Sequence, residues 1–249
     1  MAWKRGVKEE NSNALESVKL AGKELKKESA EAKKATYAIL GLGRYGKAVA
    51  KGLAGEGVKI ICVDKDDNVT QDFANANEID SMHALDVTSK ETLEKVGVNT
   101  ADTVIICMAS SLAATVIALA HCKSFNAERE DGNQIKIIAK AADETQAEIL
   151  RSLGADKVVL PEIESGGRLA KQLLHPHTFD LIEDYGLDIR QIDVKPEWAG
   201  RTLEGLRLRQ NLGYNVIAIK DKSGVPKINL TPKTRLPKGG KLVVIAKRR

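Results

Sequence analysis

Short apolar runs alternate regularly with amphipathic stretches from Thr36 to Leu160, and this alternation limits the fold more than any other feature of the sequence. Six runs predict strands, namely Tyr37–Leu40, Lys59–Val63, Ser81–Leu85, Thr103–Cys107, Gln134–Ala139 and Lys157–Leu160. Five helical patterns lie between them, near Gly46–Glu56, Asn68–Ala76, Ser89–Val96, Ala113–Phe125 and Asp143–Leu153. Strands that alternate with helices form a parallel sheet whose crossovers cover its faces. The pattern therefore predicts an α/β fold with a doubly wound, Rossmann-type parallel sheet.

The rhythm changes after Leu160. Residues 165–174 and 178–184, separated by Pro176, predict two connecting helices, and from Leu187 onward the apolar runs are short and strand-like. The last part therefore predicts a small α+β domain. We expect four segments: a charged helical extension over residues 1–34, a nucleotide-binding domain over 35–162, connecting helices over 163–186, and the small domain over 187–249.

Composition and charge restrict the class of protein. Each apolar run is far shorter than the roughly 20 residues that span a bilayer, and the N-terminus lacks the apolar core of a secretory signal, so we expect a cytoplasmic protein. The three cysteines have no CxxC spacing and are interpreted as buried thiols. Residues 35–189 contain 15 Lys and Arg against 24 Asp and Glu, whereas residues 190–249 contain 15 against four. This asymmetry suggests different partners for the two parts.

The motif Gly41-Leu42-Gly43-Arg44-Tyr45-Gly46 follows the first predicted strand and opens a helix. In such a turn the first glycine permits the tight bend, the second lets the backbone approach a diphosphate, and the third allows close packing of helix on strand. Asp64 ends the next strand, where its carboxylate can accept hydrogen bonds from ribose hydroxyls and disfavours the 2′-phosphate of NADP. The sequence therefore predicts a nucleotide site.

Two residues near this turn have more than one interpretation. Arg44 suits a distal anionic group such as the γ-phosphate of ATP, or it is a solvent-facing arginine on the first helical turn. Asp86 follows the third strand, where it reads an adenine edge or caps the following helix.

No catalytic constellation accompanies the nucleotide motif. His83, His121, His175 and His177 lack a persuasive base-and-partner arrangement, and HExxH, GxSxG and Walker A patterns are missing. We therefore assign no catalytic residue. The alternatives that stay open are an NAD-dependent oxidoreductase whose small domain supplies catalysis, and a stand-alone NAD-sensing regulator.

The order of these features resembles the RCK (regulator of potassium conductance) family, over residues of about 35–249. The motifs that carry the resemblance are Ile39–Gly46, Val63-Asp64, Leu85-Asp86-Val87-Thr88, Leu153–Glu162 and Leu203–Ile219. Among them, the stretch Gly154-Ala155-Asp156 to Pro161-Glu162 is more discriminating than the glycine turn.

The resemblance implies a regulatory subunit that binds ATP, ADP or NAD(H) without consuming it. It implies that such subunits assemble from dimers into an octameric ring beneath a membrane potassium pore or transporter. Nucleic acid is not expected as a partner, because residues 1–189 show no helix-turn-helix with a basic recognition face. Arg44 would contact the distal phosphates, Asp64 the ribose and Asp86 the adenine side. The full nucleotide-binding set is Gly41, Gly43, Arg44, Tyr45, Gly46, Asp64, Lys65, Asp86, Val87, Lys140 and Glu162. Glu162 would also help to place Mg²⁺ or Ca²⁺ near the phosphates of a neighbouring subunit.

Some members of this family bind cyclic di-AMP between two C-terminal domains. The basic charge of residues 190–249 suits such a dianionic ligand, and Arg209, Asn211 and Pro232 lie where its pocket would be built. The acidic residue usual before the last strand is Gly240 here. The alternative interpretations of this basic charge are an ordinary solvated surface, or a surface that lies near lipid head groups.

Overall fold

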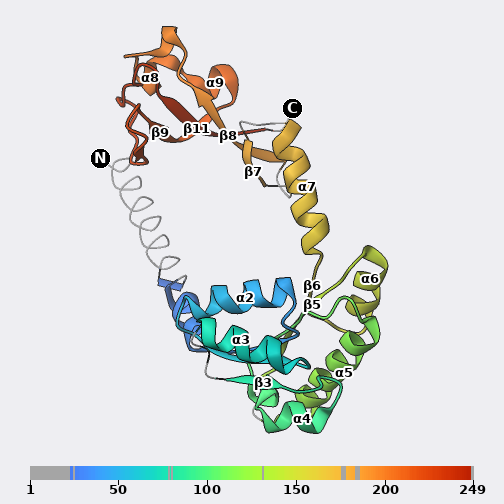
Figure 1. The fold of residues 1–249 in the computed structure, drawn as a ribbon. Coiled ribbons are helices and arrows are strands. Elements are labelled where there is room, and N and C mark those ends of the chain that lie inside the picture. The colour runs from blue at the N-terminus through green and yellow to red at the C-terminus, as the bar shows by residue number, and fades with distance from the viewer. Residues whose placement is uncertain are drawn as a thin grey trace, which may run out of the picture. The chain divides into compact units, whose positions relative to one another are not determined.

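The chain divides into two compact units, Met1–Ile163 and Glu164–Arg249, which are described separately below (Figure 1). The structure is a computed structural model and describes residues 23–24, 26–77, 79, 81–130, 132–174, 178–182 and 186–247. Most of the predicted extension, residues 1–22 and residue 25, lies outside this set. Residues 26–34 are helical and lead into the first strand.

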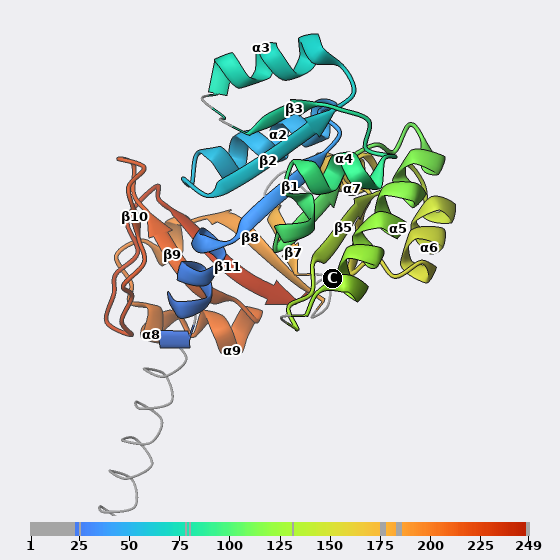
Figure 2. The same ribbon diagram turned by 90° about the horizontal axis from the view of Figure 1, so that it is seen from below.

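The first unit is built on a six-stranded parallel sheet with strand order β3-β2-β1-β4-β5-β6 (Figure 2). Its strands are β1 (Thr36–Leu40), β2 (Lys59–Asp64), β3 (Met82–Ala84), β4 (Thr103–Ile106), β5 (Lys136–Lys140) and β6 (Lys157–Val159). In the centre Ile39 of β1 pairs with Cys62 of β2 on one side and with Ile105 of β4 on the other. The order reverses between β1 and β4, which confirms the doubly wound sheet and places a ligand crevice at the carboxyl ends of these strands.

Helices connect successive strands of this sheet. They are α2 (Arg44–Ala54), α3 (Asp67–Asn77), α4 (Lys90–Lys95), the short 3-10 helix η1 (Val98–Thr100), α5 (Leu112–Glu128) and α6 (Glu144–Ser152). Polar side chains cap four of these helices: Asp66, Ser89, Ser111 and Asp143 each accept a hydrogen bond from a backbone N–H of the first turn. These caps satisfy donors that the helix itself leaves free, and they fix where each helix begins.

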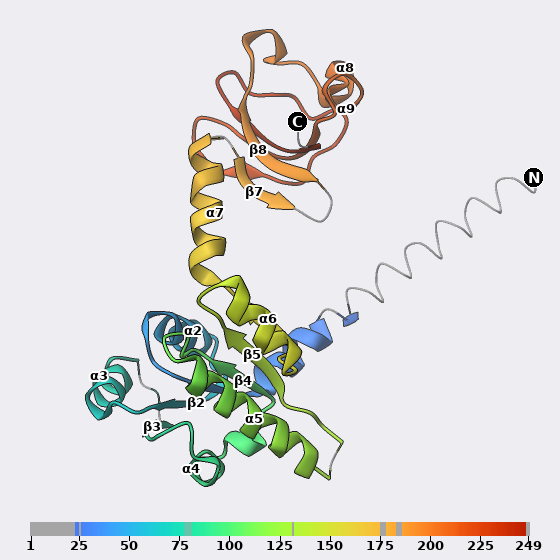
Figure 3. The same cartoon turned by 90° about the vertical axis from the view of Figure 1, so that its right-hand side faces the viewer.

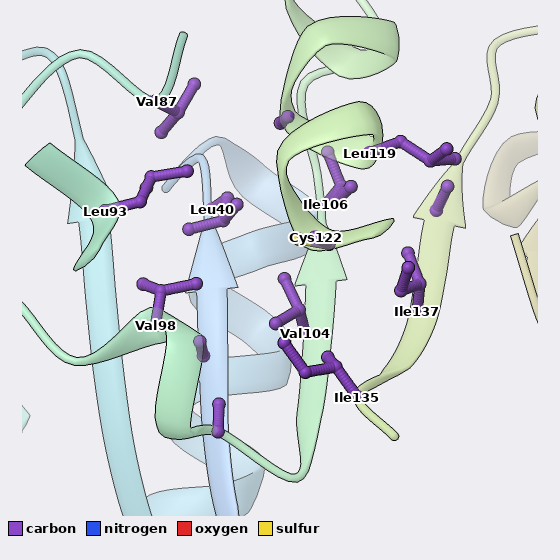
Figure 4. Packing of buried hydrophobic residues seen from close by; sticks show 14 of the residues in the cluster. Leu40, Val87, Leu93, Val98, Val104, Ile106, Leu119, Cys122, Ile135 and Ile137 are labelled. Atoms are coloured by element: carbon purple, nitrogen blue, oxygen red, sulfur yellow. The ribbon is translucent and has the colours of Figure 1, made fainter. Parts of the chain in front are cut away.

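Each face of the sheet has its own hydrophobic core, as the two-residue period of a strand requires. Along β1, Ala38 and Leu40 belong to one core and Ile39 to the other. In the larger core, Leu119 and Cys122 of α5 pack beside Ile106 of β4 (Figure 4). The sheet is therefore covered on both faces, and its strand ends are left to form a site.

The second unit contains a five-stranded antiparallel sheet with order β10-β9-β11-β8-β7. Its strands are β7 (Thr178–Ile182), β8 (Leu187–Asp193), β9 (Asn215–Lys220), β10 (Pro226–Lys227) and β11 (Lys241–Lys247). Its helices are α7 (Pro161–Leu174), which begins three residues before the unit does, the 3-10 helix η3 (Pro196–Trp198), α8 (Leu203–Leu206) and α9 (Leu208–Leu212). Trp198, Leu236 and Leu242 lie in the core of this small α+β fold.

The second connecting helix predicted over residues 178–184 is wrong. Residues 178–182 form strand β7, which pairs with β8 so that Ile182 lies opposite Leu187 (Figure 3). A short segment gains more from completing a sheet ladder than from an isolated helical turn, because one helical turn is costly to nucleate. Among the described residues, no helix is long and apolar enough to cross a membrane.

Candidate nucleotide-binding site

The three glycines of the first turn have different structural tasks. Gly41 has φ +96°, and a Cβ there would lie 2.7 Å from Met108 Cγ. Gly46 packs closest, since its Cβ would lie 2.0 Å from the carbonyl oxygen of Gly41. A Cβ on Gly43 would meet no atom within 4 Å, and its φ of −66° is open to any residue. Gly41 and Gly46 are therefore needed by the fold itself, whereas Gly43 keeps the surface of the turn low for a ligand.

The N-terminus of α2 faces this open space. Its N-cap is Gly43, which has no side chain to bond the first-turn amides, and the first turn carries no acidic residue. The first-turn N–H groups and the positive end of the helix dipole favour an anion at this point. The turn and the helix together have the features of a phosphate-binding site, and this candidate site is called the cradle below.

Asp64 is bonded to the turn. Its Oδ2 accepts a hydrogen bond from the backbone N–H of Leu42 at 2.5 Å, and its Oδ1 accepts one from the N–H of Asp66 at 3.0 Å. A carboxylate has about four acceptor positions, so contact with a ribose hydroxyl remains compatible with these bonds. Lys65 is exposed beside it. Asp64 therefore shapes the cradle as well as lining it.

A cluster of charged and aromatic side chains lies where β5 and β6 end. Lys140 Nζ donates to Glu162 Oε1 at 2.7 Å and lies 5.8 Å from the ring centroid of Tyr45, on the first turn of α2. The hydrogen bond from Lys140, with a smaller contribution from the Arg44 charge, holds the pKa of Glu162 below its ordinary value. Four of the predicted residues are thus brought together, and the Glu162 carboxylate is held there in its ionised form.

Asp86 does not cap helix α4, because Ser89 occupies the N-cap. Instead, Asp86 Oδ1 accepts hydrogen bonds from the Thr88 N–H at 2.9 Å and the Thr88 hydroxyl at 2.8 Å. These bonds keep the pKa of Asp86 below its ordinary value. Val87 is buried in the core, so its side chain does not face a ligand, and only its main chain is available for one.

The described histidines have structural partners. His83 contacts the hydroxyl of the serine two residues before it at 3.1 Å, and His121 Nε2 lies 2.8 Å from the Thr88 carbonyl oxygen. His175 and His177 lie outside the described residues. Within the described part of the chain no group of three or more His, Cys, Asp or Glu residues is arranged to hold a metal ion. A cation at Glu162 would therefore take most of its ligands from phosphate oxygens.

The sequence argument missed the loop between β4 and α5. Met108, two residues after the end of β4, is half-buried against the Gly41 turn, and the loop ends at Ser111, which caps α5. This loop lies at the carboxyl end of the strand next to β1, at the point where the strand order reverses. The predicted strand order could have pointed to this loop, because doubly wound sheets bind their ligands where the strand order reverses.

In the second unit, a cavity of about 560 Å³ contains two of the three residues predicted for cyclic di-AMP. Its lining residues are Leu203, Glu204, Arg207, Leu208, Arg209, Gln210, Tyr214, Asn215, Val216 and Pro232. Asn211 is not among them; its side-chain amide donates to the Leu206 carbonyl at 3.1 Å, and its role in a pocket between two such domains stays a prediction. Asn215, at the start of β9, lines the cavity.

Comparison with known proteins identifies both units. The TrkA-N domain model matches residues 37–161 and the TrkA-C domain model matches residues 189–249. Two similar proteins are the Ktr system potassium uptake protein C of Bacillus subtilis (strain 168), 27% identical over 75% of this chain and 81% of its own length, and the Ktr system potassium uptake protein A of Vibrio alginolyticus, 26% identical over 74% and 80%.

The fold is also found in a solved structure of the GsuK channel bound to NAD. The TM-score is 0.51 and the identity 24%, over 86% of this chain. This chain spans only 37% of that channel chain. The likeness therefore concerns the fold.

Proposed function

The chain belongs to the family of proteins that carry a TrkA-N domain followed by a TrkA-C domain, the RCK family, and we propose that it is a nucleotide-sensing regulatory subunit of a potassium channel or transporter. The observation that carries the proposal is the phosphate cradle at the uncapped N-terminus of α2, with the cations of Arg44 and Lys140 beside it. The names of the two Ktr relatives support the connection to potassium uptake.

The proposed ligand is ATP or ADP, or alternatively NAD(H). The cradle binds the diphosphate, Asp64 contacts the ribose, and the Asp86 turn faces the adenine. Arg44 is exposed on the first turn of α2, where its charge reaches Glu162, so it can extend toward a third phosphate. NADP is disfavoured, because the Asp64 carboxylate would repel its 2′-phosphate.

The output of this sensor is proposed to pass through helix α7. Glu162 is the second residue of this helix, and its carboxylate shares Lys140 with any phosphate bound at the cradle. A bound phosphate that attracts Lys140 removes the cation that neutralises the Glu162 carboxylate. The phosphate and the carboxylate then repel each other, unless a divalent cation bridges them. The nucleotide must bind the two resulting conformations unequally, since equal affinity would shift neither.

We propose that the protein acts in the cytoplasm, at the inner face of the membrane, as a homo-oligomer of dimers in an octameric ring attached to a membrane pore. The cavity at Arg209 and Pro232 is the proposed second site, for cyclic di-AMP, with Asn215 in its lining. Sensing is preferred to NAD-dependent hydride transfer, because the histidines described above serve structural contacts. Turnover of NADH with a small carbonyl compound would favour the oxidoreductase instead.

Calorimetric titration of ATP, ADP, NAD, NADH and NADP, with and without Mg²⁺ or Ca²⁺, tests the proposal. We expect the folded protein to bind an adenine nucleotide and not NADP. Arg44→Ala should narrow the affinity ratio of ATP to ADP, whereas Lys51→Ala, which removes an exposed cation from the last turn of the same helix, should leave it unchanged. Failure of the folded wild type to bind any nucleotide contradicts the sensor, and an unchanged ratio in Arg44→Ala contradicts the role of Arg44.

A further inference from the structure

The turn formed by Asp86, Val87, Thr88 and Ser89 is held by contacts on several sides. Val87 is 6% exposed and lies in the core of the first unit (Figure 4). The Ser89 N–H donates to the Asp86 carbonyl at 3.2 Å, and Thr88 donates twice to Asp86 Oδ1. Both side-chain bonds use Oδ1, so Oδ2 keeps its capacity to accept a hydrogen bond from a ligand.

One contact of this turn comes from a distant part of the chain. Nε2 of His121, on helix α5, lies 2.8 Å from the carbonyl oxygen of Thr88, 33 residues earlier in the sequence. A carbonyl oxygen only accepts, so Nε2 must be the donor. The neighbouring Cys122 is fully buried in the core, so the backbone of α5 is fixed at this point. His121 therefore ties the turn to a helix that is packed in the core.

We propose that His121 is a positioning residue for base recognition. By holding the Thr88 carbonyl it fixes the peptide between Thr88 and Ser89, and the same Thr88 orients the Asp86 carboxylate through its N–H and hydroxyl. Asp86 Oδ2 is thereby presented to the amino group of the adenine. This inference rests on the proposed function, in which Asp86 faces the adenine side of the nucleotide. His121 contacts no ligand and acts through Thr88 and Asp86.

The experiment compares ATP with inosine triphosphate, which carries an oxygen in place of the adenine amino group. The quantity measured is the ratio of the two affinities, by titration calorimetry on the full chain. His121→Asn shortens the side chain so that its amide no longer reaches Thr88, and we expect the ratio to fall by about two- to tenfold, the worth of one oriented hydrogen bond. His121→Gln places an amide N–H near the position of Nε2 and should restore most of the ratio.

The same two variants are then made in an Asp86→Ala background, where His121→Asn should no longer change the ratio because its effect passes through Asp86. Ser124→Ala is the matched control: it removes contacts of the same helix with Lys90 and Glu128 but none with the turn. It should leave the ratio as in the wild type.

A purely structural role for His121 would lower the melting temperature and leave the ratio unchanged, and that result overturns the inference. So does an equal effect of His121→Asn with and without Asp86, or a wild type that binds ATP and inosine triphosphate equally. A folded wild type that binds neither triphosphate, nor NAD or NADH, contradicts the proposed function itself and is thereby distinguished from a failure of His121 alone.

Discussion

Three glycines at the start and in the body of α2 allow the fold and the ligand to be tested separately by the same substitution. Alanine adds one methyl group at Gly43, Gly46 or Gly52, and the surroundings of that methyl group differ completely. At Gly43 and Gly52 no atom lies within 4 Å, whereas at Gly46 the new Cβ would lie 2.0 Å from the Gly41 carbonyl oxygen. One chemical change is therefore expected to have three different outcomes.

Gly46→Ala should destabilise the protein. Its Cβ would stand 1.0 Å inside the 3.0 Å below which real Cβ contacts are essentially never found, and the atom it meets belongs to the backbone. Overpacking of this kind costs about 1–3 kcal/mol, and a rigid backbone partner favours the upper end. The better helix propensity of alanine offsets about 1 kcal/mol. We expect the free energy of unfolding to fall by about 2 kcal/mol.

The other two substitutions have no steric cost. Gly52→Ala lies inside α2 and should raise the free energy of unfolding by about 1 kcal/mol through helix propensity alone. Gly43→Ala replaces glycine at an N-cap, where alanine is less favourable by about 0.5 kcal/mol. However, its methyl group would fill the space in which a diphosphate approaches the turn, so we expect nucleotide affinity to fall about tenfold or more.

Urea unfolding followed by circular dichroism measures the three stabilities, and calorimetric titration with ATP and NADH measures the affinities. The packing argument is refuted if Gly46→Ala is as stable as Gly52→Ala. The cradle argument is refuted if Gly43→Ala binds as tightly as a wild type that does bind nucleotide.

Two further predictions concern the cysteines and a strained arginine. Burial raises the pKa of the Cys62, Cys107 and Cys122 thiols from 9.0 to about 12. The folded protein at pH 8 should therefore react with iodoacetamide far more slowly than the urea-unfolded chain. Rapid labelling of any of the three cysteines in the folded protein, detected by mass spectrometry, would contradict their burial. Among the described residues, Arg207 is the non-glycine residue with a positive φ, of 48°. Arg207→Gly should remove about 1 kcal/mol of backbone strain, partly offset by the entropy of glycine in the unfolded chain, and so raise the urea midpoint of unfolding. The control Arg201→Gly should not raise the midpoint, and a lower midpoint in Arg207→Gly would argue against strain.

The sequence predicted the architecture of the first unit because its signals are local. Strands β1, β2 and β4 are apolar runs with both faces buried, and the caps Ser89, Ser111 and Asp143 mark where helices begin. Strand β7 was mistaken for a helix because its stability comes from pairing with β8, a contact that no local pattern reveals. The start of α2 was placed two residues late, since its N-cap is a glycine without a capping side chain.

The cavity lined by Arg209 and Pro232 shows the same limit at the level of single residues. Asn211 and Asn215 lie four residues apart, and the sequence offers no local reason to prefer one. Helix α9 ends at Leu212 and the chain reverses at Gly213, whose φ is 70°. Asn211 therefore stays on the helix and bonds to Leu206, whereas Asn215 begins a strand and reaches the cavity. The position of one helix end decided which amide is available.

At the nucleotide site, the sequence could show which residues gather but not what they already bind. The carboxyl ends of the parallel strands bring Asp64, Asp86 and Lys140 to one edge of the sheet. In the structure Asp64 is bonded to Leu42, Asp86 to Thr88, and Lys140 to Glu162. A nucleotide at this edge must share or exchange these partners, so its affinity is a difference between two sets of hydrogen bonds and ion pairs. Of the three, the Lys140–Glu162 pair is the one that includes a side chain of α7, and it is therefore the contact through which we propose that a bound phosphate acts on that helix.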